Sequence, residues 1–330
     1  MIEAYPPAST VLEHRAATID FEPVVNCALP GPVGRVHEHI RLQPLGSGVT
    51  VHGRGVEDAG ASMRAALMMA AAADRPELAL MCPARPVVRV VEPDSERFRR
   101  PWPVLIFVHG GGWVTGSLRS YAALISSFAA RGFLTLAPAY RLAPEHVYPA
   151  AELDVLSCVR FAQQHAASFG GDAARMVLAG DSAGAQICAG VIARLAAKSD
   201  ESNEAGDIRA AAVLYAVADL RSLETPELHG IRRMRDWYLG EGRCGDRGVI
   251  EQASPVMHAR TMPPTVVVAA GEDALRGQSL AYGAALRAAS VEHELIDVPD
   301  VPHGFLQCGL WPETSRTLDR VKAFLLEAAS

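Results

Sequence analysis

The chain has 330 residues, a formal net charge of −6 at pH 7 and 49% hydrophobic residues. This acidic balance supplies no basic patch for nucleic acid, and no apolar stretch approaches the roughly 18 residues that cross a bilayer, so we expect neither nucleic-acid binding nor stable membrane insertion. The first residues lack a basic region followed by an apolar one, which favours a cytoplasmic protein.

The N-terminal segment, residues 1–80, carries no assignable motif, and we expect it to form part of a cap. It holds a helical fragment at Ala61–Ala73 between loops rich in Gly and Pro. A His-Glu-His run at 37–39 would place two imidazoles on one face of a strand, but no third ligand with metal spacing lies near it. A polar surface segment is therefore the favoured interpretation.

From Pro86 onward, short β-branched runs alternate with longer Ala- and Leu-rich segments, which is typical of parallel strands joined by crossover helices. The expected strands are Val87–Val91, Val104–Val108, Leu134–Ala137, Met176–Ala179, Ala211–Tyr215, Thr265–Ala269 and Glu294–Asp297. The expected helices are Ser120–Ala130, Ala150–Phe169, Ala183–Ala197, Gly277–Ala289 and Glu313–Ala328. We predict one α/β domain over residues 81–330, with an exposed loop at 199–207.

A charged, amphipathic segment at about 221–257 interrupts this alternation between two strands. An insertion there would lie over the carboxyl ends of the strands, where open α/β sheets bind ligands. We predict that it forms a lid together with residues 1–80. Met234, Trp237 and Tyr238 are candidates for lining a substrate pocket, and ordinary packing within the cap explains them equally well.

Two glycine-rich motifs directly follow predicted strands. His-Gly-Gly-Gly-Trp at 109–113 leaves backbone N–H groups unshielded by side chains, as a developing oxyanion requires. Gly-Asp-Ser-Ala-Gly at 180–184 joins a strand to a helix, which is the setting of a nucleophile elbow. Ser182 is therefore the candidate nucleophile.

A serine hydroxyl requires a general base, and that base requires an orienting acid. His303 follows the last predicted strand, and Asp273 follows the strand before it. Because the carboxyl ends of parallel strands share one edge of the sheet, these residues can converge on Ser182. The spacing leaves Glu272 as a rival acid, whereas His109 more plausibly braces the glycine run than acts as the base.

These motifs, in this order, resemble the hormone-sensitive-lipase-like branch of the α/β-hydrolase carboxylesterases. The resemblance covers roughly residues 85–328 and also includes Tyr-Arg-Leu-Ala-Pro-Glu at 140–145 and Asp-Ala-Leu-Arg at 273–276. It implies a mostly parallel eight-stranded sheet, helices on both faces and a helical cap. Two departures are Ala185, where many relatives have glycine, and Gly277, where they often have aspartate.

The resemblance also implies specific roles. Ser182, Asp273 and His303 become a catalytic triad, with Asp273 preferred over Glu272, and the oxyanion hole becomes the N–H groups of Gly111, Gly112 and Ala183. The implied activity is hydrolysis of short-chain acyl esters through an acyl-enzyme, with a small-molecule ester as substrate and neither cofactor nor metal. An amide-directed hydrolase, such as a formamidase or deacetylase, and a non-catalytic small-molecule receptor are the alternatives.

Two further expectations concern assembly and redox state. Dimers are frequent among similar enzymes, so a homodimer is an open alternative. Six cysteines are scattered without Cys-x-x-Cys spacing, and we expect them to be reduced packing residues. They are Cys27, Cys82, Cys158, Cys188, Cys244 and Cys308.

Overall fold

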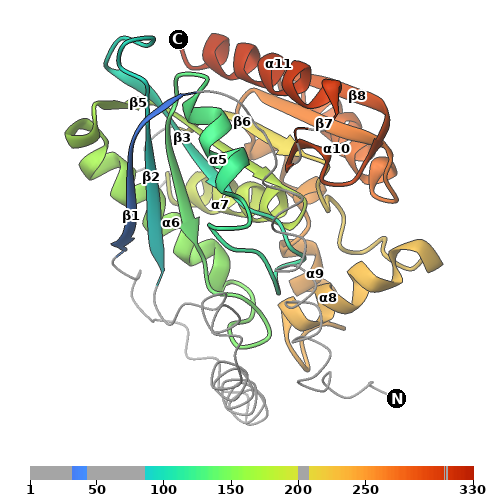
Figure 1. Cartoon of the computed structure of the whole chain (residues 1–330). Helices are drawn as coiled ribbons and strands as arrows, with labels where there is room; N and C mark the ends of the chain where they lie inside the picture. The colour runs from blue at the N-terminus through green and yellow to red at the C-terminus, as the bar shows by residue number, and fades with distance from the viewer. Residues whose placement is uncertain (1–31, 43–85, 200–207, 308, 310) are drawn as a thin grey trace, which may run out of the picture.

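A computed structural model of the chain describes residues 32–42, 86–199, 208–307, 309 and 311–330. Its centre is an eight-stranded sheet in the order β1-β2-β4-β3-β5-β6-β7-β8 (Figure 1). The strands are β1 (Val33–Arg41), β2 (Val87–Pro93), β3 (Trp102–Val108), β4 (Leu134–Ala139), β5 (Gly171–Asp181), β6 (Ile208–Leu214), β7 (Thr265–Glu272) and β8 (His293–Pro302). The predicted α/β fold with a mostly parallel sheet is confirmed.

The direction of the strands sets where a site can form. Every neighbouring pair from β4 to β8 is parallel, whereas β1 with β2 and β2 with β4 are antiparallel. The carboxyl ends of the parallel strands therefore meet along one edge. Loops leaving β3, β5, β7 and β8 open at that edge, and they carry the motifs that the sequence predicts to be functional.

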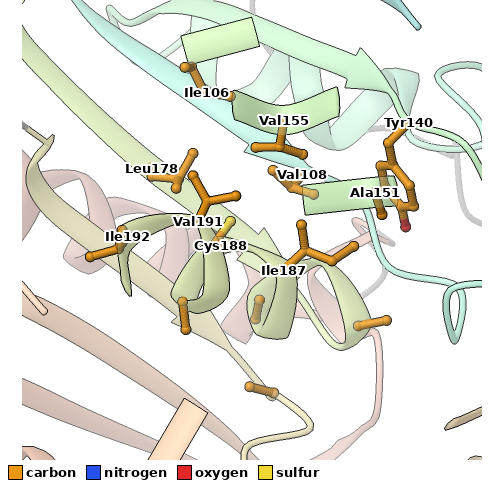
Figure 2. Packing of buried hydrophobic residues seen from close by; sticks show 14 of the residues in the cluster. Ile106, Val108, Tyr140, Ala151, Val155, Leu178, Ile187, Cys188, Val191 and Ile192 are labelled. Atoms are coloured by element: carbon orange, nitrogen blue, oxygen red, sulfur yellow. The ribbon is translucent and has the colours of Figure 1, made fainter. Parts of the chain in front are cut away.

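Helices cover both faces of the sheet. Successive side chains of a strand point to opposite faces, so a strand with apolar side chains on both faces must be covered on both. They are α5 (Ala122–Ala129), α6 (Ala150–His165), α7 (Ala183–Ser199), α10 (Arg276–Ala288) and α11 (Pro312–Ala328). Along β3, Ile106 and Val108 join the core cluster beneath α6, α7 and α10, whereas Leu105 and Phe107 join the cluster beneath α5 and α11. Figure 2 shows Ile106 and Val108 facing side chains of α6 and α7.

The predicted elements match the observed ones apart from their ends. The helix expected over 150–169 ends as an α-helix at His165 and continues as a 3₁₀ turn at Ala166–Phe169, which Gly170 closes with a φ of 81°. Tyr215 lies just beyond β6 with a φ of 37°, rather than inside the strand. The loop predicted at 199–207 lies, apart from Ser199 at the end of α7, outside the described residues.

One part of the N-terminal segment departs from the cap prediction, because residues 33–41 form the edge strand β1. The strand is largely exposed and has two register irregularities against β2, so its sequence lacks the apolar alternation that would reveal it. His37 contacts Glu92 of β2 at 2.8 Å through Nε2, and the side chain of His39 lies outside the described residues. The prediction for residues 1–31 and 43–80, including Ala61–Ala73, also falls outside them.

The insertion between β6 and β7 contains η2 (Pro226–Leu228), α8 (His229–Leu239), α9 (Arg247–Gln252) and η3 (Pro255–Thr261). It packs against the carboxyl edge of the sheet. The indole of Trp113 stacks on the ring of Tyr238 with centroids 4.9 Å apart, and Gln186 Nε2 donates to the carbonyl of Ala253 at 2.9 Å. Its action as a lid together with residues 1–80 stays a prediction.

Two further properties concern the described residues alone. Their helices include none with the length and hydropathy needed to cross a membrane. Cys158 and Cys188 are buried free thiols and Cys244 is a partly buried one, whereas the remaining three cysteines lie outside the described residues.

Candidate active site

Ser182 stands at a sharp turn between β5 and α7. Its φ of 53° is in the left-handed region, where a non-glycine residue is strained, and its N–H donates to the carbonyl of Leu214 on β6 at 2.9 Å. The flanking glycines are required by space, because a Cβ on Gly184 would lie 2.1 Å from the carbonyl oxygen of Val108 and one on Gly180 would lie 2.6 Å from Gly184. The local sequence thus presents the hydroxyl at the carboxyl edge of the sheet.

The structure brings the three predicted residues Ser182, His303 and Asp273 into one hydrogen-bonded chain. The Ser182 hydroxyl lies 3.0 Å from His303 Nε2, and His303 Nδ1 lies 2.7 Å from Asp273 Oδ2. The second oxygen of Asp273 accepts the N–H of Leu275 at 2.9 Å. Because Nδ1–H donates to the carboxylate, Nε2 is free to accept the hydroxyl proton.

The side chains of Asp273 and His303 differ in their exposure to solvent. The side chain of Asp273 is 4% exposed and that of His303 is 39% exposed. The carboxylate therefore acts in a water-poor setting, where its attraction to an imidazolium is strengthened, while the imidazole remains accessible to a substrate. The two rivals are placed elsewhere: Glu272 is an exposed residue at the end of β7, and His109 is 2% exposed within the glycine run.

His109 braces the loop that follows β3. Its Nδ1 lies 2.8 Å from the carbonyl of Gly110, and its ring stacks on Tyr140 with centroids 4.4 Å apart. Burial lowers the pKa of His109 to about 4, so the ring is neutral at physiological pH. This environment fits a structural histidine.

In the glycine loop, residues 109–113, two positions have a backbone that glycine adopts more readily than other residues. Gly111 and Gly112 have φ values of 111° and 57°, and a Cβ on Gly111 would lie 2.4 Å from the carbonyl oxygen of Thr115. In the described part of the chain, nothing accepts a hydrogen bond from the N–H of Gly111 or Gly112. The N–H of Ala183, at the first position of α7, lacks an acceptor within its helix.

Sequence reasoning missed the residues that hold these loops around Ser182. The buried carboxylate of Asp181 accepts the N–H of Gly110 at 2.7 Å, and it also accepts Tyr121 and Gln307. The ring of Tyr215 meets that of His303 edge to face, with centroids 5.0 Å apart. Asp181 belongs to the motif around Ser182, so the sequence could have drawn attention to it. Its hydrogen-bond partners, however, come from segments far away in the chain.

Of the three candidate pocket residues on α8, Met234 lies at the glycine loop. A Cβ on Gly112 would be 2.3 Å from its sulfur. Tyr238 is 1% exposed and packs between Trp113 and Tyr148. Trp237 is 6% exposed, with the Arg233 guanidinium 5.8 Å from its ring. Tyr238 is thus a packing residue, whereas Met234 lies against the glycine loop at Gly112.

The geometry defines a class of protein. A serine at a strand–turn–helix elbow, joined to a histidine and an aspartate from later loops at the carboxyl edge of a mostly parallel sheet, is the arrangement of an α/β-hydrolase. A family model described as "alpha/beta hydrolase fold" matches residues 105–307. The chain belongs to this family, in the hormone-sensitive-lipase-like carboxylesterase branch that its motifs indicate.

Relatives of known name agree with this placement. Esterase LipI of Mycobacterium tuberculosis (strain ATCC 25618 / H37Rv) is 29% identical over 258 residues, which cover 74% of this chain and 79% of LipI. Ethyl acetate hydrolase of Pseudomonas putida is 30% identical over 237 residues, which cover 67% and 72% of the two chains. Among solved structures, a bacterial heroin esterase aligns with a TM-score of 0.74 at 21% sequence identity. The alignment covers 98% of this chain and 93% of the heroin esterase chain, and it shows a similar fold.

Proposed function

We propose that this chain is a serine carboxylesterase that hydrolyses short-chain acyl esters through an acyl-enzyme on Ser182. Its class as a carboxylic ester hydrolase follows from the family and from relatives named as esterases and carboxylesterases. The proposal of an acyl-enzyme mechanism is supported by the hydrogen-bonded chain of Ser182, His303 and Asp273 beside the glycine loop. The amide-directed and receptor alternatives are not favoured by any of the relatives reported above.

In the proposed reaction, His303 Nε2 takes the proton of Ser182 as the hydroxyl oxygen attacks the ester carbonyl. The tetrahedral intermediate collapses, His303 donates that proton to the leaving alcohol, and the acyl group remains on Ser182. Water then enters, loses a proton to Nε2 and attacks the acyl carbonyl. Release of the acid returns the proton to Ser182.

The negative oxygen of each tetrahedral intermediate requires donors that are already in place. We assign this role to the N–H groups of Gly111, Gly112 and Ala183, because the loop conformation leaves the first two without acceptors among the described residues and the third begins α7. One such donor contributes about 10²–10³ in kcat. No step of this scheme requires a group beyond the protein and water.

Asp273→Asn tests the orienting acid. The carboxylate accepts Nδ1–H at 2.7 Å, and a neutral amide weakens that bond and allows the other tautomer, so we expect kcat to fall by about 10³–10⁴. Steady-state hydrolysis of p-nitrophenyl acetate measures the loss. Glu272→Gln, one residue away and exposed, is the matched control, and we expect it to behave like the wild type. A loss for Glu272→Gln instead would reassign the acid.

Acyl-chain preference tests the proposed substrate class. Met234 borders Gly112, so the space above the loop is limited on that side, and we expect turnover to be highest for acetyl to hexanoyl p-nitrophenyl esters. Activity that peaks at dodecanoyl or longer, or that rises at a lipid interface, would contradict the proposal.

Parallel assays on phenyl acetate and N-formylkynurenine separate ester from amide preference. On sequence grounds we also propose a cytoplasmic location.

A further inference from the structure

Asp181, next to the nucleophile, connects three separate segments of the chain. One carboxylate oxygen accepts the N–H of Gly110 at 2.7 Å, and the other accepts the Tyr121 hydroxyl at 3.0 Å and the Gln307 amide Nε2 at 3.1 Å. Gln307 Nε2 also lies 2.8 Å from the Tyr121 hydroxyl. Gly110 belongs to the glycine loop, and Gln307 ends the short segment 303–307 that begins with His303.

This carboxylate is buried and makes no hydrogen bond or ion pair with a basic side chain among the described residues. Asp181 is 0% exposed, and the groups that bond to it are an amide N–H, a phenol and a carboxamide. Burial raises the pKa of Asp181 to about 6, although its hydrogen bonds and nearby His303 oppose the rise. The titratable groups that face it are Tyr121, Tyr140, Cys188, Tyr215 and His303.

A buried charge of this kind lowers the stability of the fold. Since the folded protein binds the proton more tightly than the unfolded chain does, stability decreases as pH rises through the interval between the usual carboxyl range and about 6. A neutral residue at this position avoids that loss. Packing alone therefore does not account for a carboxylate here, whereas a role at the adjacent site does.

We propose that Asp181 is a positioning residue whose ionised carboxylate holds the glycine loop and segment 303–307 in register with Ser182. The inference rests on the proposed esterase function and adds a requirement to it. The carboxylate offers acceptors to all three donors at once. A protonated carboxyl, or the amide of asparagine, carries a hydrogen on one of its two polar atoms and offers weaker or fewer acceptors, so the contacts to Gly110 and Gln307 are weakened.

Weaker contacts to Asp181 would displace the N–H groups that we assign to the oxyanion hole. Gly110 directly precedes the donors assigned to the oxyanion, and a displacement of about 1 Å in such a group costs on the order of 10²-fold in rate. Substrate binding away from the reacting carbonyl is unaffected. Loss of the Asp181 charge should therefore lower kcat more than it raises KM.

The test compares Asp181→Asn with the wild type on p-nitrophenyl acetate between pH 5 and pH 8. We expect a kcat at least about tenfold lower at pH 8, a KM within about threefold of the wild-type value, and an unchanged or higher melting temperature. In the wild type, protonation of Asp181 adds its own loss of activity at acid pH, so log kcat/KM should fall more steeply below about pH 6 than it does in the variant. In the variant, which has no carboxyl group at this position, the additional loss should be absent.

A second readout does not depend on turnover. Hydrogen–deuterium exchange of peptides covering 109–113 and 303–307 should be faster in Asp181→Asn, because the Gly110 and Gln307 contacts are weakened. Asp154→Asn is the matched control: this carboxylate is 1% exposed and bonds to Arg141 at 2.8 Å, so we expect the wild-type slope and wild-type exchange in both peptides.

Two results would overturn the inference. One is an Asp181→Asn variant with wild-type kcat and acid slope; the other is a loss of activity that merely follows a lower melting temperature, with slope and exchange unchanged. Failure of the proposed function is distinguishable, because the wild type would then lack Ser182-dependent turnover while the exchange comparison still reports on Asp181.

Discussion

Ser182→Ala is expected to reduce kcat for p-nitrophenyl acetate by about 10⁴-fold or more while leaving the fold intact. The hydroxyl oxygen is the atom that forms the acyl-enzyme in the proposed mechanism, and the glycine loop and His303 alone retain only a small residual rate. Removing the hydroxyl leaves the hydrogen bond between His303 and Asp273 in place. Steady-state kinetics and circular dichroism together test both halves of this expectation.

The control for this variant is Ser168→Ala. Ser168 is an exposed serine in the 3₁₀ turn before the amino end of β5, whereas Ser182 stands at the carboxyl end of the same strand. Its hydroxyl donates to the carbonyl of His165, and its loss should leave turnover unchanged. Near-full activity in Ser182→Ala would remove the nucleophile assignment and with it the acyl-enzyme.

Gly184→Ala is expected to have the largest effect on stability. Its Cβ would lie 2.1 Å from the carbonyl oxygen of Val108 and 2.5 Å from that of His109, and neither backbone atom can move without shifting β3 against β5. We expect the free energy of unfolding to fall by about 3 kcal/mol or more, or the protein to fail to fold. Urea denaturation followed by circular dichroism measures the difference.

Gly277→Ala is the matched glycine substitution within a helix. Gly277 is near the start of α10, and a Cβ there would have nothing within 4 Å. Alanine should therefore stabilise the protein by about 0.5–1 kcal/mol, because it restricts the unfolded chain and suits a helix. A Gly184→Ala protein as stable as the wild type would show that the elbow does not need its second glycine.

Local sequence patterns were sufficient to predict the strands that are buried on both faces. The continuous apolar runs of β3, β5, β6 and β7 predict strands covered on both faces, and all four occur at the predicted places. The edge strand β1 was missed because it is largely exposed and irregular in register, and its apolar residues do not alternate. The end of the helix at His165 was missed because the following 3₁₀ turn has the same local composition.

For the site, the sequence supplied the residues whose position in a motif is fixed by chain geometry. Ser182, Asp273 and His303 each follow a strand of the same sheet, so their convergence could be anticipated from topology. The contacts of Tyr215 with His303, and of Tyr121 and Gln307 with Asp181, could not. They depend on side chains from distant segments meeting in the folded core, where sequence spacing carries no information.

In the proposed mechanism, an ester substrate acylates Ser182. Rapid mixing with p-nitrophenyl acetate, acid quenching before deacylation is complete, and peptide mapping by mass spectrometry test this step directly. We expect an acetyl group on the peptide that contains Ser182, at a time when the first equivalent of nitrophenol has been released. Acetylation confined to another residue, or sustained hydrolysis with Ser182 never modified, would contradict it.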